Sequence, residues 1–282
     1  MGNATQASPA RVDRDRLAGV PAQLVFARRS SDEAAPAAIA PKAYSIPVVS
    51  YDVTIRNARP IVDELSLDKE GFALIKHKIS CTDVRDPNLM RDRYLEEMVP
   101  FIKDYFKASR VVPKRNGVVL RRADQGANPA NMAPISKTAH SDYAPIAGPV
   151  LAAAESQEQG IPITAYSRLM IIQAWRVLSP PPQDFPLTVC DASTIPDRDM
   201  LVVDYGRNEP GWHKSWSIFH SPAHRWYYFP EMTADEFIMW KGYDSATHYN
   251  VRSAHTAFDD RHTYPNAIPR ESVEARFFVY YD

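Results

Sequence analysis

The sequence has few of the features that mark secreted, membrane or nucleic-acid-binding proteins. It contains only two cysteines among 282 residues, Cys81 and Cys190, and their positions share no metal-ligand spacing. A disulfide scaffold is therefore not expected, and a reducing compartment is. No run of about 18 apolar residues is present, so we expect no transmembrane helix. The first residues lack the apolar core of a signal peptide, which predicts a cytoplasmic protein.

Charge of one sign is not in excess either. The 33 basic and 34 acidic residues leave a formal net charge of −1. We therefore expect no nucleic-acid partner and no membrane partner. Glycine is scarce, with 10 residues, whereas proline is abundant, with 24. That balance suits strands joined by stiff loops, and the 45% hydrophobic content is enough for a substantial core.

The composition changes near residue 43. Residues 1–42 are rich in Ala, Arg, Asp, Ser and Pro, and we predict a flexible N-terminal arm. Its apolar patch at residues 24–27 is the one candidate strand. Residues 43–282 are predicted to form a single domain, which is a normal size for one all-β unit.

Short strands dominate the predicted elements of that domain. Residues 48–55 are β-branched, and residues 168–178 are the strongest strand, with Gln173 and Trp175 on one face. One clear helix begins at Asp86 and is predicted to end near Ser109. Many strands and few helices predict a mainly β fold: a double-stranded β-helix (jelly roll, cupin-like) with a few flanking helices.

His140 and Asp142 stand two positions apart in the stretch TAHSDY. Residues i and i+2 of a strand point to the same face, so both side chains can hold one divalent ion. A distant histidine would complete a two-histidine, one-carboxylate facial triad with open positions, as in non-haem Fe(II) oxygenases. The pair alone is weak evidence, because a surface loop with a histidine and a capping aspartate has the same sequence pattern.

Several histidines compete for the third position. His213, His220 and His224 crowd one segment, but a proline between the last two argues against a helix that holds both. His255 follows later, within an apolar setting. We choose His255 because a basic anchor comes shortly after it in the chain.

That anchor is the sequence Arg270-Glu271-Ser272. An arginine and a hydroxyl two residues apart on a strand can hold one carboxylate together. The cosubstrate 2-oxoglutarate carries such a carboxylate at its far end, and its 2-oxo acid end can fill two open positions on iron. A solvated arginine is the alternative for Arg270 alone, but the order H-x-D, distal His, R-x-S is far less common by chance.

The chain resembles the AsaB/CmcJ/NvfI group of hydroxylases, desaturases and related oxygenases of secondary metabolism. The stretches that carry the resemblance are HSDY, RLMIIQAW, PLTVCDAST, WYYFPEMTADE, KGYDS, HTAFDD and PRESVEAR. The resemblance implies a double-stranded β-helix that uses Fe(II), 2-oxoglutarate and O₂. It implies that His140, Asp142 and His255 bind the metal, and that Arg270 and Ser272 bind the cosubstrate.

Two further cosubstrate residues follow from the same resemblance. Arg276 is a second candidate for the arginine of the clamp. Gln173 stands where the family pattern has asparagine, and either amide can donate to a carboxylate. We therefore predict that both residues contact the cosubstrate.

The substrate side of the pocket is predicted from position. The loop of residues 124–134 runs into His140, so its Asn128 and Asn131 are expected to contact substrate oxygens. A lid of this kind excludes water from the reaction. The aromatic residues Tyr143, Trp212 and Trp216 are expected to complete that side, and the alternative is that both tryptophans pack in the core.

Three function classes stay open from the residues. The first is an Fe(II)/2-oxoglutarate-dependent dioxygenase that hydroxylates, desaturates, cyclises or forms a peroxide in a small secondary metabolite. The second is a metal-dependent hydrolase with the same ligands, in which the R-x-S anchor has no role. The third is a jelly-roll binding protein without chemistry. We expect a small-molecule substrate and leave a homodimer open.

Overall fold

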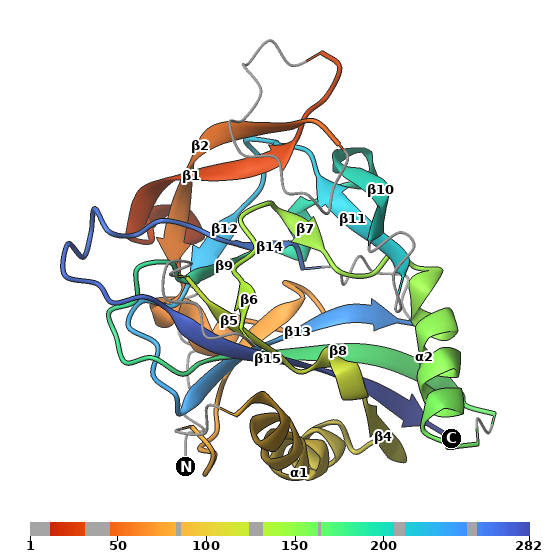
Figure 1. Cartoon of the computed structure of the whole chain (residues 1–282). Coiled ribbons are helices and arrows are strands. Elements are labelled where there is room, and N and C mark those ends of the chain that lie inside the picture. The colour runs from red at the N-terminus through yellow and green to blue at the C-terminus, as the bar shows by residue number, and fades with distance from the viewer. Residues whose placement is uncertain are drawn as a thin grey trace, which may run out of the picture.

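Two β-sheets face each other in the computed structural model, with helix α1 (Pro87–Phe106) beneath the second sheet and α2 (Ala147–Glu158) at one end (Figure 1). The structure describes residues 12–31, 46–82, 86–123, 132–162, 165–205, 212–246 and 253–282. This is the predicted double-stranded β-helix with flanking helices, so the fold class is confirmed. Among the described residues, no helix combines the length and apolar character needed to cross a bilayer.

The first sheet has eight strands within the described part of the chain. In spatial order they are β1 (Gly19–Ala27), β2 (Val48–Asn57), β12 (Trp226–Tyr228), β9 (Leu187–Cys190), β14 (His255–Ala257), β7 (His140–Ser141), β11 (His213–Ile218) and β10 (Met200–Tyr205). Neighbours in this order are mostly distant in sequence. The sheet thereby brings residues 140 and 255 into adjacent strands.

The second sheet lies on the opposite side of the molecule's interior (Figure 1). In spatial order it contains β3 (Phe72–Lys76), β13 (Glu236–Asp244), β8 (Arg168–Val177), β15 (Glu271–Tyr281), β5 (Val119–Arg122) and β6 (Ala133–Pro134), and β4 (Arg110–Pro113) also pairs with β15. Short 3-10 turns join the strands at η1 (Arg14–Arg16), η2 (Arg59–Glu64), η3 (Arg115–Gly117), η4 (Ala192–Thr194) and η5 (Asp197–Asp199).

Strand β15 is buried on both faces, and the period of two along the strand assigns each side chain to a face. Its outward residues, such as Val273 and Phe277, pack with Met98 and Ile102 of α1 in one apolar cluster. Its inward residues begin with Ser272 and are polar over the first half of the strand. One face therefore holds the fold together, while the other supplies polar groups to the interior.

Helix α1 begins where its sequence predicts and ends within a few residues of the predicted end. The Asp86 side chain accepts hydrogen bonds from the backbone N–H groups of Asn88 and Leu89, which caps the first turn. Pro100 lies inside the helix without ending it. Lys107 has a φ of 50° and ends the helix, slightly earlier than the predicted end near Ser109.

The described part of the N-terminal arm contains the candidate strand at residues 24–27. Residues 19–27 form β1, which pairs antiparallel with β2 over its whole length. Leu24 and Phe26 are fully buried in the core cluster of the first sheet. Arg14 also reaches across to Glu70, with 2.8 Å between Nη1 and Oε1. The candidate strand at residues 24–27 is therefore confirmed, and it extends back to Gly19.

Two further segments are strands. Residues 213–218, next to Trp212, form β11 inside the first sheet. The sequence TADE at residues 233–236 resembles a helix-capping box but begins no helix. Glu236 opens β13 instead, and its carboxylate pairs with Arg59 at 2.5 Å.

Candidate metal and cosubstrate site

The three predicted ligands lie close together in the interior between the two sheets. His255 of β14 lies directly opposite His140 of β7, and Asp142 follows β7 by one residue. One ligand atom from each of these three side chains lies within 4.8 Å of the others. The fold therefore brings the three predicted ligands together, because it pairs strands from distant parts of the chain.

Backbone carbonyls orient both imidazoles. The Nδ1–H of His140 donates to the carbonyl of Thr138 at 2.7 Å, and Nδ1 of His255 lies 3.3 Å from the carbonyl of Ser253. Each contact leaves Nε2 as the atom with a free lone pair. Such outer hydrogen bonds fix the tautomer and the direction of a metal-binding histidine.

Electrostatics keep the ligands in the protonation states that metal binding needs. Burial alone would raise the pKa of Asp142, but the charge of Arg276 holds it well below its ordinary value. Burial, reinforced by His140, lowers the pKa of His255 to about 4. At neutral pH the site therefore offers a carboxylate and a neutral imidazole.

The anchor Arg270 lines the same cavity as the triad. It is 2% exposed, and its Nη1 donates to the carbonyl of Phe185 at 2.9 Å. Burial and the charge of Arg121 lower the pKa of Arg270 to about 9, so it remains cationic at neutral pH. Among the described residues no carboxylate forms an ion pair with it. A buried cation of this kind needs an anion.

Orphaned polar atoms test whether 2-oxoglutarate fits. Within the described residues, Nε of Arg270 and the hydroxyl of Ser272 are buried and have no hydrogen-bond partner. Buried polar groups are normally paired, so both point to a missing acceptor. A carboxylate accepts hydrogen bonds from both kinds of donor. Arg270 lines the cavity, and Ser272 lies two residues further along the chain, in β15. The two imidazoles and one carboxylate of the triad likewise fit Fe(II) with open positions.

Two residues predicted to contact the cosubstrate both contact Asp142. Nε2 of Gln173 lies 2.5 Å from Oδ2 of Asp142, and Nη2 of Arg276 lies 2.9 Å from the same oxygen. Arg276 also pairs with Glu274 at 2.7 Å. Arg276 also lines the cavity, and the cosubstrate contact of Gln173 and Arg276 stays a prediction.

The predicted substrate residues do not line the cavity. Tyr143 is 1% exposed and packs in the cluster that α2 covers. Trp216 pairs with Ser141 on the face of β11 opposite His140 and packs against the first-sheet core, while Trp212 is 49% exposed. The substrate contacts of these three aromatics stay a prediction. Asn128 and Asn131 lie outside the described residues.

Sequence reasoning did not assign seven of the residues that line this cavity: Arg121, Ser136, Trp175, Leu187, Trp240, Thr256 and Glu274. Glu274 lies two residues from both Ser272 and Arg276, so the alternation of β15 alone predicts that it faces the cavity. Arg121 is opposite Ser272 in the pairing of β5 with β15. Trp240 packs against the ring of His255, with 4.7 Å between ring centres. The positions of Arg121 and Trp240 follow only from the strand register.

The rival histidines have other contacts. Nε2 of His224 lies 3.1 Å from Oδ2 of Asp199, and His220 stacks on Tyr51 with 3.9 Å between ring centres. Nε2 of His213 donates to the carbonyl of Asp142 at 3.1 Å. These three histidines form no common ligand set among the described residues.

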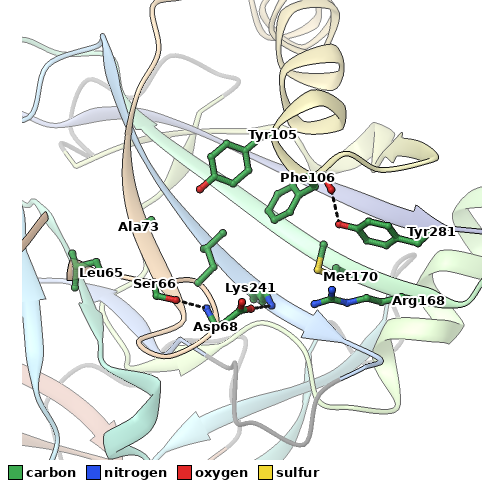
Figure 2. Close-up of a pocket in the computed structure, with 11 residues that line it drawn as sticks. Leu65, Ser66, Asp68, Ala73, Tyr105, Phe106, Arg168, Met170, Lys241 and Tyr281 are labelled. Atoms are coloured by element: carbon green, nitrogen blue, oxygen red, sulfur yellow. Dashed lines mark hydrogen bonds and ion pairs between the residues drawn. The ribbon is translucent and has the colours of Figure 1, made fainter. Parts of the chain in front are cut away.

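A second cavity lies on the outer face of the second sheet, beside the C-terminal end of α1 (Figure 2). Lys241 and Arg168 both bind Asp244 there, and Tyr105 stands at the edge. No histidine lines it. Since Arg168 and Gln173 lie on opposite faces of β8, the sheet separates this cavity from the triad.

Comparisons with known proteins agree with this chemistry. The family described as "Oxidoreductase/YMDC permease-like domain" matches residues 24–280. The hydroxylase/desaturase efuI of Hormonema carpetanum is 29% identical over 253 residues, covering 82% of this chain and 83% of that protein. The Fe(II)/2-oxoglutarate-dependent dioxygenase nvfI of Aspergillus novofumigatus is 28% identical over 238 residues, with the same coverage of both chains.

Solved structures show the same fold. The iron and alpha-ketoglutarate-dependent endoperoxidase NvfI superposes with a TM-score of 0.76 at 23% identity. The match covers 93% of this chain and 98% of that one.

Proposed function

The chain belongs to the oxidoreductase family of Fe(II)/2-oxoglutarate-dependent oxygenases of secondary metabolism, and from this premise we propose the role of each residue at its site. Its cofactors are Fe(II), 2-oxoglutarate and O₂, and its substrate is a small molecule. His140, Asp142 and His255 hold the iron. Arg270 and Ser272 hold the distal carboxylate of 2-oxoglutarate.

The buried, unpaired charge of Arg270 carries this proposal. A hydrolase with the same metal ligands has no use for a cation in that position. In an oxygenase the guanidinium and the Ser272 hydroxyl bind the cosubstrate carboxylate through charge-assisted hydrogen bonds. The contact with Phe185 fixes the direction of the guanidinium before the anion arrives.

The reaction divides between the bound groups and the protein. Bound iron supplies O₂ activation, in which 2-oxoglutarate is oxidised to succinate and CO₂ and a C–H bond of the substrate is oxidised. The protein orients both imidazoles through Thr138 and Ser253. Trp175, Leu187 and Trp240 form apolar walls that keep water from the reacting centre. We propose hydroxylation, desaturation, oxidative cyclisation or endoperoxide formation as the outcome on a mostly apolar metabolite.

Anaerobic titration tests these roles directly. Metal-loaded protein should bind 2-oxoglutarate, and metal-free protein should bind it far more weakly. After oxygen is admitted, succinate should form only with both groups present. Equal binding of 2-oxoglutarate to the wild type and to Arg270→Ala would contradict the anchor, whereas absence of metal at His140 and His255 would contradict the whole assignment.

We also propose that the protein works in the cytoplasm and that residues 43–282, together with β1, act as one unit. Cys81 and Cys190 are both buried and free, which suits a reducing compartment. Cell fractionation tests the location. The homodimer that the sequence left open is tested by sedimentation at two protein concentrations.

A further inference from the structure

The side chains of Asp142, Gln173, Glu274 and Arg276 form a closed ring of hydrogen bonds beside the metal site. Oδ2 of Asp142 accepts from Nε2 of Gln173 at 2.5 Å and from Nη2 of Arg276 at 2.9 Å. Oε1 of Glu274 faces the same two donors, at 3.0 Å from Gln173 and 2.7 Å from Arg276. Two donors therefore alternate with two carboxylates, and each donor bridges both acids.

The ring makes the two oxygens of Asp142 unequal. Oδ2 receives two hydrogen bonds, which use the acceptor positions of that oxygen. Oδ1 lies 3.3 Å from Nε2 of His140 and faces the other ligands. Only Oδ1 is then directed at a metal ion. A carboxylate that binds through one oxygen leaves more positions open than one that chelates.

We propose that Gln173 is a positioning residue that fixes Asp142 as a one-oxygen metal ligand through this ring, and that it does not bind the cosubstrate. The inference rests on the proposed function of the triad. Both amide hydrogens of Gln173 are already used, on Asp142 and Glu274. Its Oε1 accepts no hydrogen bond within the described residues, and an acceptor oxygen has no affinity for a carboxylate.

The backbone of β13 makes room for the longer amide. The register between β13 and β8 shifts between Lys241 and Tyr243, at Gly242. A Cβ atom at Gly242 would lie 2.6 Å from Oε1 of Gln173 and 2.6 Å from the ring of Tyr143. A glycine is therefore required beside Gln173.

Ion pairs on the outer face of the sheet hold that irregular segment in place. Nζ of Lys241 binds Asp244 at 2.8 Å, and Nε of Arg168 binds the same carboxylate at 2.9 Å. Lys241 precedes Gly242 in the sequence, and Asp244 follows Gly242 by two residues. In the stretch KGYDS, Lys241 and Asp244 therefore pair on the outer face of the sheet, while Gly242 leaves space for Gln173 on the inner face.

Gln173→Asn tests the inference, because asparagine ends one carbon–carbon bond short of Asp142. Loss of such an outer hydrogen bond lowers metal affinity by about 10-fold or more. We expect that loss in a Co(II) or Fe(II) titration, together with a changed visible absorption spectrum of the Co(II) form, which reports coordination number. The affinity of metal-saturated protein for 2-oxoglutarate should change little.

Gln159→Asn is the matched control. The amide of Gln159 also donates to a carboxylate, at 2.6 Å from Glu155, and to the carbonyl of Pro113 at 2.8 Å, but it lies at the end of α2. This variant should keep the wild-type metal affinity and Co(II) spectrum. Weaker 2-oxoglutarate binding by Gln173→Asn, with metal affinity and spectrum unchanged, would overturn the inference and place Gln173 on the cosubstrate.

Gly242→Ala gives a second route if Gln173→Asn does not fold. The added methyl group would overlap Oε1 of Gln173 and displace its amide. The metal affinity and the Co(II) spectrum should therefore change in the same direction as in Gln173→Asn. In a Gln173→Asn background the same change at Gly242 should add little to the metal effect. An unchanged spectrum in Gly242→Ala also counts against the ring. A wild-type protein that binds metal and 2-oxoglutarate shows that the proposed function survives either result.

Discussion

The guanidinium carbon of Arg270 lies 5.2 Å from the centre of the Trp175 ring, inside the cavity that contains the metal triad. The indole face stabilises the cation only in part. Because no carboxylate pairs with Arg270 in the described residues, the free protein holds a buried charge that a dicarboxylate ligand would neutralise.

Removal of that charge should weaken cosubstrate binding selectively. Truncation of one partner in a buried ion pair costs about 2–5 kcal/mol. Arg270→Ala should therefore raise the dissociation constant for 2-oxoglutarate by tens-fold or more, measured on metal-loaded protein without oxygen. Metal affinity should stay close to that of the wild type. Arg270→Lys should restore binding only in part, because a lysine lacks the planar fork.

The metal ligands should be separable from the fold. His140→Ala and His255→Ala should each abolish stoichiometric Fe(II) binding and succinate formation, because two remaining ligands hold the ion poorly. The circular dichroism spectrum should be unchanged. His220→Ala serves as the control, since His220 stacks on Tyr51 away from the triad, and it should retain the metal. Metal retained by His255→Ala would refute the assignment.

The sequence predicted the triad because metal chemistry restricts residue type. Histidine and aspartate two apart, followed by an arginine and a serine two apart, leave few alternatives to a facial triad with a carboxylate clamp. The fold class followed from the many short strands and few helices that the sequence predicts. What brings His255 to His140, however, is a pairing of β14 with β7 that no local pattern encodes.

Side-chain direction is what the residue pattern leaves open. Arg276 lines the cavity. Which acids Gln173 and Arg276 contact depends on the register of β8 against β15, where the two residues stand opposite each other. Trp216 was assigned to the substrate because its segment is rich in histidine. The register of β11 turns Trp216 away from His140, and no composition argument contains that information.

Acid should destabilise the metal-free protein through His255. Its pKa is about 4 in the folded state, against an ordinary value of 6.5, because burial disfavours the charged form. The unfolded chain therefore binds a proton that the folded chain excludes, and the stability conferred by the neutral ring is lost as pH falls from about 6.5 towards 4. Urea unfolding at several pH values measures this loss.

His224 and His77 also have lowered pKa values caused first by burial, so they contribute in the same direction. The His255→Asn variant isolates the contribution of His255. Its stability should depend less on pH than that of the wild type within the same window. Identical pH profiles for the two proteins would show that His255 titrates normally.

Arg276 should matter most when no metal is present. It is the one cation that pairs with both Asp142 and Glu274 among the described residues, at 2.9 and 2.7 Å. Arg276→Gln leaves two buried carboxylates facing each other across the amide of Gln173. Loss of one partner from a buried pair costs about 3–5 kcal/mol, so the free energy of unfolding of the metal-free variant should fall by that order.

A divalent ion should restore much of this loss, because it neutralises Asp142 from the other side. The deficit of Arg276→Gln, measured by urea unfolding, should therefore shrink in saturating Co(II). Arg168→Gln is the control. Arg168 pairs with Asp244 on the outer face, where Lys241 remains as a partner, and its cost should be small and independent of metal. If metal leaves the Arg276→Gln deficit unchanged, the guanidinium does not act through Asp142.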